Sequence, residues 1–319
     1  MRKFLRSCLR FGSLTIVIYV VLIFTTTRII GTKVSFVLPD TVDKLVLGHS
    51  HPECALNDSL VPGLANFSNS GEAYFYAYYK LKKILDQNKN IKTVFIELSN
   101  NQITKRADEW IWKSNYIESR YPKYVSYMDT EGHLLLWNKN PKSHFSVCNT
   151  LLSSNTKVFK TGAYNYAHQV GGFLHLNKNK IDSFLLLPQK IEEEKLFDQK
   201  SIYNLRYLDK IIEYCKSKKV TPVLIRCPVH PKFAEFKNEK QYRSILDKRY
   251  KNVAFLDFVK FRLPNKEFAD MEHLNYIGAR RFSVFFDSII KDELLTYPQK
   301  QKMIDTSIQR EQDILLQQD

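Results

Sequence analysis

Two short stretches of this sequence hold residues whose types and spacing suit nucleophilic chemistry. Gly48-His49-Ser50-His51 directly follows an apolar run, and Asp270 precedes His273 by three residues near the C-terminus. A serine hydroxyl becomes a nucleophile when a positioned imidazole takes its proton and a carboxylate orients that imidazole. An Asp three residues before a His can fold back onto the ring. We therefore predict Ser50 as nucleophile, His273 as base and Asp270 as its orienting carboxylate.

Acyl transfer also needs hydrogen-bond donors for the oxyanion of the tetrahedral intermediate. Ser70-Gly71 and Asn100-Asn101 each follow a predicted strand. The backbone N–H groups of Ser50 and Gly71 and the carboxamide of Asn100 or Asn101 are the predicted donors. The sequence does not indicate which of the two asparagines is the donor.

The elements that position these residues alternate between strand and helix. Predicted strands cover Asp43–Gly48, Gly63–Gly71, Ile91–Ser99, Val220–Pro228 and Asn252–Phe258. Predicted helices cover Glu72–Asn88, Ser201–Lys219, Glu239–Tyr250 and Tyr276–Glu293. Such alternation predicts a parallel sheet with helices on both faces. The carboxyl ends of its strands share one edge, where functional residues gather.

In this order, the blocks resemble the SGNH/GDSL hydrolase-like superfamily. They are G-x-S, a Ser-Gly, an Asn and the sequence D-x-x-H-L-N-x-x-G from Asp270 to Gly278. The resemblance covers about Asp43–Asn101 and Val220–Ile290. It implies a flavodoxin-like three-layer α/β sandwich whose central parallel sheet has about five strands. It also implies the roles given above: nucleophile, base, orienting acid and oxyanion donors.

The sequence departs from the family pattern at two points. His49 replaces the acidic residue of the usual G-D-S, and no glycine stands two residues before the asparagine. The first departure keeps a second hypothesis open: a catalytically silent SGNH-like module that binds glycan or partners a membrane acyltransferase.

The N-terminus predicts a membrane anchor. The uncharged segment Phe11–Thr27 is about long enough to cross a bilayer, and it lacks the small residues of a cleavage site. Residues 1–30 are predicted as a retained signal-anchor with a cytoplasmic basic end and an exported remainder. A cleaved signal and a buried helix are the alternatives. Four basic residues precede the segment: Arg2, Lys3, Arg6 and Arg10.

Three further segments complete the predicted organisation. Residues 40–295 form the SGNH-like domain, interrupted at 103–199 by an insertion too long for a simple loop. The insertion is predicted to be a subdomain, such as a lid or an acceptor platform. Residues 296–319 are predicted as a polar tail, either frayed helix or disordered.

The composition of the chain limits the classes of ligand that we expect. The chain carries 48 Lys+Arg against 33 Asp+Glu, a net charge of +15, but the lysines are scattered and form no compact stripe. Nucleic acid is therefore not expected, although a tethered binder of anionic polymers remains a third hypothesis. The five cysteines form no C-x-x-C pair, and we expect no acidic partners close to His49 and His51. We expect no metal and no cofactor.

The resulting functional hypothesis is serine-dependent acyl-ester chemistry at an extracytoplasmic membrane surface. The enzyme would be an esterase or an O-acyl- or acetyltransferase, acting on an envelope polysaccharide or another acylated substrate. A membrane-bound acyl-donor protein is a possible partner.

Overall fold

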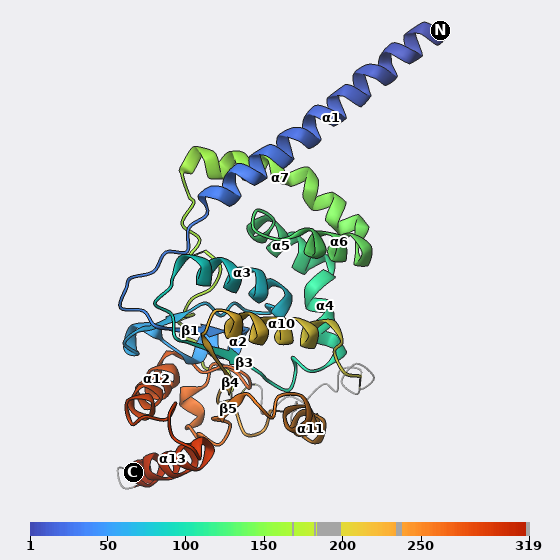
Figure 1. The fold of residues 1–319 in the computed structure, drawn as a ribbon. Coiled ribbons are helices and arrows are strands. Elements are labelled where there is room, and N and C mark those ends of the chain that lie inside the picture. The colour runs from blue at the N-terminus through green and yellow to red at the C-terminus, as the bar shows by residue number, and fades with distance from the viewer. Residues whose placement is uncertain (168, 182, 184–198, 234–237, 317–319) are drawn as a thin grey trace. The chain divides into compact units, whose positions relative to one another are not determined.

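The computed structural model of the 319-residue chain describes residues 1–167, 169–181, 183, 199–233 and 238–316 (Figure 1). The chain forms two compact units. The helical unit comprises Met1–Phe36 and Trp112–Tyr166, and the α/β unit comprises Val37–Ile111 and Ala167–Asp319. Every site residue predicted from the sequence lies in the α/β unit.

The α/β unit is built on a five-stranded sheet in which all neighbouring strands are parallel. The strand order is β2-β1-β3-β4-β5, the flavodoxin-like order, so the predicted fold class is confirmed. The strands are β1 (Lys44–Leu47), β2 (Leu64–Asn66), β3 (Thr93–Glu97), β4 (Thr221–Arg226) and β5 (Ala254–Asp257). Each lies within a segment predicted to be extended.

Helices cover both faces of this sheet. On one face, α2 (Ser50–Ala55) and α12 (Tyr276–Lys291) pack together over a core to which the strands contribute alternate residues. On the other face, α3 (Tyr74–Gln87) and α10 (Tyr203–Ser217) lie side by side (Figure 1). Helix α11 (Glu239–Arg249) joins β4 to β5, and two 3-10 turns occupy Asp58–Leu60 and Asn265–Glu267. The face under α2 and α12 includes Val46, Phe95, Val223, Ile225 and Leu256.

The C-terminal segment differs from its prediction, because Lys300–Leu316 forms helix α13. Ile304 and Ile308, one turn apart, are buried in the core of the α/β unit. The Gln301 carboxamide accepts a hydrogen bond from the backbone N–H of Asp257 and donates one to its C=O, each 3.0 Å long. Two apolar residues and one amide thus hold this polar helix against the edge strand β5. Residues 317–319 of the predicted tail lie outside the described residues.

The helical unit contains α1 (Arg2–Lys33), α5 (Ser114–Tyr124), α6 (Thr130–Lys139) and α7 (Pro141–Thr161). Helix α7 packs along α1, where the Tyr19 hydroxyl donates to the Asn149 C=O at 2.8 Å. Helix α1 is long and apolar enough to cross a membrane or to serve as a signal sequence.

The segment predicted as one insertion, residues 103–199, is divided between the two units. Its middle part, Trp112–Tyr166, belongs to the helical unit. Its first residues, including most of helix α4 (Lys105–Trp112), belong to the α/β unit, as does the stretch from Ala167 onward. Residues 168, 182 and 184–198 of the insertion lie outside the described residues.

Candidate active site

Ser50 stands at the carboxyl end of β1, where the strand turns into α2. Gly48 makes this turn possible: a Cβ there would lie 2.5 Å from Pro52 Cγ and 2.6 Å from Glu97 Oε2. Because Ser50 is the first residue of α2, its backbone N–H has no partner within the helix. The turn therefore presents both a hydroxyl and a backbone donor at the edge of the sheet.

The three residues predicted to form a triad lie together. His273 Nε2 is 2.7 Å from Ser50 Oγ, and His273 Nδ1 is 2.8 Å and 3.0 Å from the two oxygens of Asp270. This arrangement fits a neutral imidazole whose Nδ1–H donates to Asp270 and whose Nε2 accepts from the serine. Burial raises the pKa of Asp270, but the hydrogen bond and charge interaction with the His273 ring, together with the backbone N–H groups of Glu272 and His273, leave the pKa below its ordinary value. The His273 side chain is 20% exposed, so a substrate can reach it from solvent.

The residues that follow His273 explain the spacing of the C-terminal motif. The side-chain oxygen of Asn275 caps α12 by accepting from the N–H groups of Ile277 and Gly278. Its Nδ2 donates to the Lys266 C=O at 2.7 Å, and the Ala269 N–H donates to the His273 C=O at 2.8 Å. The loop that carries Asp270 and His273 is therefore fixed at both ends.

The residues predicted as oxyanion donors differ in their hydrogen-bond partners. Gly71 adopts a left-handed φ of 64° in the turn after β2, and the Asn69 N–H of that turn donates to the Gly48 C=O. Asn100 instead directs its amide to α11, donating to Asn238 Oδ1 at 2.9 Å and Glu239 Oε2 at 3.0 Å. Asn101 is buried, and its Oδ1 accepts from the Ser99 hydroxyl at 2.7 Å. Asn101 Oδ1 also lies 3.0 Å from Nε2 of His49, the neighbour of Ser50, whereas the Asn100 amide is engaged at the start of α11.

Two glutamates that sequence reasoning missed lie against the histidines beside Ser50. Glu97, at the end of β3, is fully buried, and its Oε1 lies 3.2 Å from His49 Nε2 and 2.9 Å from His51 Nδ1. Its Oε2 accepts from the His49 backbone N–H at 2.8 Å. Glu272 Oε2 lies 3.6 Å from His51 Nε2. The expectation that these histidines lack acidic partners is therefore wrong.

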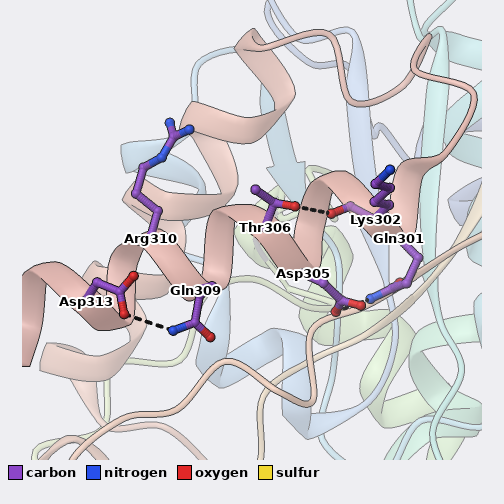
Figure 2. A pocket seen from close by; sticks show the side chains of 7 residues that line it. All are labelled: Gln301, Lys302, Asp305, Thr306, Gln309, Arg310 and Asp313. Atoms are coloured by element: carbon purple, nitrogen blue, oxygen red, sulfur yellow. Dashed lines mark hydrogen bonds between the residues drawn. The ribbon is translucent and has the colours of Figure 1, made fainter.

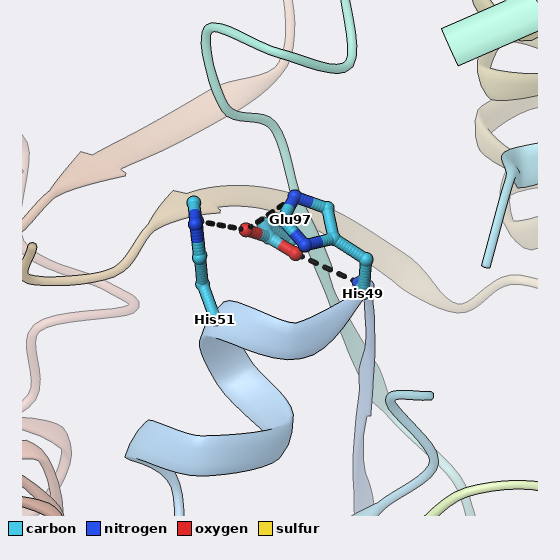
Figure 3. A group of neighbouring side chains, drawn as sticks. All are labelled: His49, His51 and Glu97. Carbon is cyan, nitrogen blue, oxygen red and sulfur yellow. Dashed lines mark hydrogen bonds and ion pairs between the residues drawn. The ribbon is translucent and has the colours of Figure 1, made fainter. Parts of the chain in front are cut away.

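This cluster, His49, His51 and Glu97, separates the protonation states of its two histidines (Figure 3). Burial lowers the pKa of His49 to about 4, more than Glu97 raises it. Burial also disfavours the charged form of His51, but Glu97 and Glu272 outweigh it and raise the pKa of His51 to about 10. Such opposed shifts in neighbouring groups are typical of functional sites.

A strap that the sequence did not reveal crosses the same edge of the sheet. Within residues 171–181, Gly172 N–H donates to the Ser68 C=O and Leu174 N–H donates to the Glu53 C=O. Further along, the Leu176 C=O accepts from Tyr276 N–H. The His175 and Tyr276 rings stack with their centroids 4.8 Å apart. The strap therefore joins the elements that carry Ser50 and His273.

Two hollows contribute little to the site. The larger, about 820 Å³ and open to solvent, is lined only by the polar face of α13 and includes no predicted site residue (Figure 2). The smaller, about 10 Å³, has room for little more than one water molecule. Its lining comprises His51, Ser99, Asn100, Arg226, Cys227, Val229 and Phe233. An acyl group would therefore approach Ser50 from the solvent side.

Cysteine offers no alternative nucleophile next to this site. All five cysteines are free thiols. Burial raises the pKa of Cys54 and of Cys227, so both thiols stay protonated and unreactive.

A family model matches part of the chain. The model of an uncharacterised family matches residues 182–295, less than half of the chain. The matched segment includes Asp270 and His273 but not Ser50. The search of curated proteins finds no match. Fold and geometry thus define the class: a flavodoxin-like α/β protein with a Ser–His–Asp hydrogen-bond chain at the carboxyl edge of its sheet.

Proposed function

We propose that this protein is a serine-dependent esterase or O-acyltransferase of the SGNH type. The observation that carries the proposal is the continuous chain from Asp270 through His273 to Ser50, with contacts of 2.8 Å and 2.7 Å. Both contacts are within hydrogen-bond distance, and His273 is accessible from solvent. A serine placed this way is activated by its neighbour without a cofactor.

In the first step, Ser50 Oγ attacks the carbonyl carbon of an ester while His273 Nε2 takes the hydroxyl proton. Asp270 stabilises the imidazolium that forms. The backbone N–H groups of Ser50 and Gly71 are the donors for the oxyanion, each worth roughly 3 kcal/mol of barrier. When the intermediate collapses, the imidazolium returns its proton to the leaving alcohol, and the acyl group remains on Ser50.

In the second step, the acyl group passes to an acceptor hydroxyl. His273 takes the proton of that hydroxyl and later returns it to Ser50 Oγ, which restores the free enzyme. Water as acceptor gives an esterase, and a sugar hydroxyl gives an O-acyltransferase. We favour an envelope polysaccharide or a similar acylated glycan as substrate, with a membrane-bound protein as possible acyl donor.

Helix α1 supports an extracytoplasmic location for this chemistry. Its first ten residues include Arg2, Lys3, Arg6 and Arg10, and residues 11–27, which follow in the same helix, carry no charge. A basic end of this kind stays on the cytoplasmic side. We propose that α1 is a retained signal-anchor that tethers the α/β unit to the outer face of the membrane.

A fluorophosphonate probe on the full chain in detergent tests the enzyme directly. The wild type should label at Ser50, and Ser50→Ala and His273→Ala should abolish labelling. Ser59→Ala changes an exposed serine outside the site and should label like the wild type. A folded wild type that neither labels nor cleaves acetyl esters would contradict the proposal and favour the silent module.

A reaction with an ester that carries a labelled acetyl group, run with and without candidate acceptor glycans, separates esterase from O-acyltransferase activity. An esterase releases all of the label as free acid, whereas a transferase moves part of it onto the glycan.

A further inference from the structure

The cluster of His49, His51 and Glu97 beside Ser50 contains a buried carboxylate oxygen that lacks a hydrogen bond of acceptable geometry within the part of the chain that the structure describes. Glu97 is fully buried, and burying a carboxylate is costly unless each oxygen has a partner. Its Oε2 is satisfied by the His49 backbone N–H. Its Oε1 has two ring nitrogens within 3.2 Å, yet no hydrogen bond of acceptable geometry reaches it from the described residues.

We propose that His49 Nε2, His51 Nδ1 and Glu97 Oε1 bind one divalent transition-metal ion, Zn²⁺ by preference, beneath Ser50. Two imidazole nitrogens and one carboxylate oxygen are a ligand set that suits zinc. Figure 3 shows the carboxylate of β3 between the two rings, which both come from the turn into α2. The inference does not depend on the proposed function, because the ligands are separate from the triad.

The distances fit a shared ion. Ligand atoms about 2.0–2.1 Å from a tetrahedral zinc lie roughly 3.3 Å from one another. The observed separations from Glu97 Oε1 are 3.2 Å and 2.9 Å, and all three atoms lie within 4.8 Å of one another. Rings that aim at a common ion rather than at the oxygen itself also explain the poor hydrogen-bond geometry at Oε1.

Metal-binding histidines usually have an oxygen near the second ring nitrogen; for His49 it lies within hydrogen-bond distance, and for His51 the Glu272 carboxylate lies just beyond that distance. His49 Nδ1 lies 3.2 Å from Ser50 Oγ, and His51 Nε2 faces the Glu272 carboxylate at 3.6 Å. Asn101 Oδ1, which lies 3.0 Å from His49 Nε2, offers an oxygen for the fourth position.

This arrangement assigns His49 a positioning role. With Nε2 on the metal, the ring proton sits on Nδ1 and donates to Ser50 Oγ, while the serine proton points to His273. The metal would thus orient the nucleophile through His49, without touching substrate.

Metal content provides the test. The full chain, purified in detergent without a histidine tag, should retain one zinc per chain by mass spectrometry. His51→Ala and Glu97→Gln should each retain none. His175→Ala removes an exposed histidine outside the cluster and should keep the metal. Ser50→Ala should also keep it while losing probe labelling, which separates this inference from the proposed function.

Measurements of thermal unfolding show whether each variant is folded. Chelation should lower the unfolding temperature of the wild type, and added zinc should restore it. Folded Glu97→Gln should respond to neither. A wild type that holds no metal and shows no zinc-dependent shift would overturn the inference and leave a buried imidazolium–carboxylate pair. Zinc retained by the His51→Ala and Glu97→Gln variants would overturn it as well.

Discussion

A single oxygen, Asp270 Oδ1, holds both the backbone and the ring of His273. It lies 2.9 Å from the His273 backbone nitrogen and 2.8 Å from ring Nδ1. The same oxygen accepts from the Glu272 N–H at 2.9 Å. The carboxylate therefore shapes the turn and selects the imidazole tautomer at once, and substitutions can separate these two effects.

Asp270→Asn keeps an oxygen for the turn but removes the charge and allows the wrong tautomer. We expect kcat for ester cleavage to fall about 10³- to 10⁴-fold, with an unchanged unfolding temperature. Asp270→Ala should lose similar activity and also about 1 kcal/mol of stability, because the turn loses its acceptor. Steady-state kinetics and thermal unfolding of both variants make the comparison. Full activity in Asp270→Asn would remove Asp270 from the triad.

Gly48→Ala should strain the turn that presents Ser50. The added Cβ would meet Pro52 and Glu97 within 2.6 Å, and neither can move far because both are buried. Overpacking of this kind costs about 1–3 kcal/mol, measurable as a lower midpoint of urea unfolding. Gly12→Ala is the matched control, since a Cβ there meets nothing within 4 Å. Equal midpoints for the two variants would refute the close approach.

Ile304→Ala tests whether α13 belongs to the core. Truncating a buried isoleucine should cost about 2–4 kcal/mol. Thr306→Ala, on the exposed face of the same helix, should change stability by less than about 0.5 kcal/mol. Chemical unfolding of both variants decides the matter. Similar stability in the two would mean that α13 is dispensable to the fold.

Protonation of Glu239 should lower the free energy of unfolding at acid pH. Burial raises its pKa, but hydrogen bonds from Arg226 and Asn100, together with the charges of Arg226 and Arg243, hold the pKa below its ordinary value of 4.5. The folded state thus binds this proton less readily than the unfolded state. The free energy of unfolding that ionised Glu239 contributes is fully present above its pKa in the unfolded state. It is lost as pH falls through its pKa in the folded state.

Glu239→Gln should therefore flatten the decline of the unfolding temperature below pH 4.5. The control is Glu213→Gln, which changes an exposed glutamate on α10 and should keep the wild-type profile. Identical profiles for the wild type and Glu239→Gln would show that this glutamate does not contribute.

The sheet could be predicted from sequence because its signals are local. Apolar runs such as Ile91–Ser99 and the alternation with amphipathic helices determine strand positions and parallel pairing. The Asp270–His273 spacing is also local, which is why their contact could be foreseen. For α13 a frayed helix was one of two alternatives, and its packing against the core was not predicted, because only Ile304 and Ile308 carry it, too few for a clear period.

The cluster around Glu97 could not be predicted in the same way. Glu97 is 48 residues from His49 in sequence, and only the pairing of β1 with β3 brings them together. Asn100 posed the opposite problem, since its strand-end position suggested the site but its amide bonds to α11. Side-chain direction depends on tertiary partners that neither spacing nor composition reveals.

The sequence separation of 223 between Ser50 and His273 also orders events during biosynthesis. The ribosome makes Ser50 long before it reaches His273, and the loop that holds Asp270 is anchored by α12, which is made later still. In a nascent or truncated chain that ends before α12, Ser50 therefore has no anchored His273 beside it. Under the proposed function, the serine becomes reactive only after the last part of the sheet and its covering helix have been made.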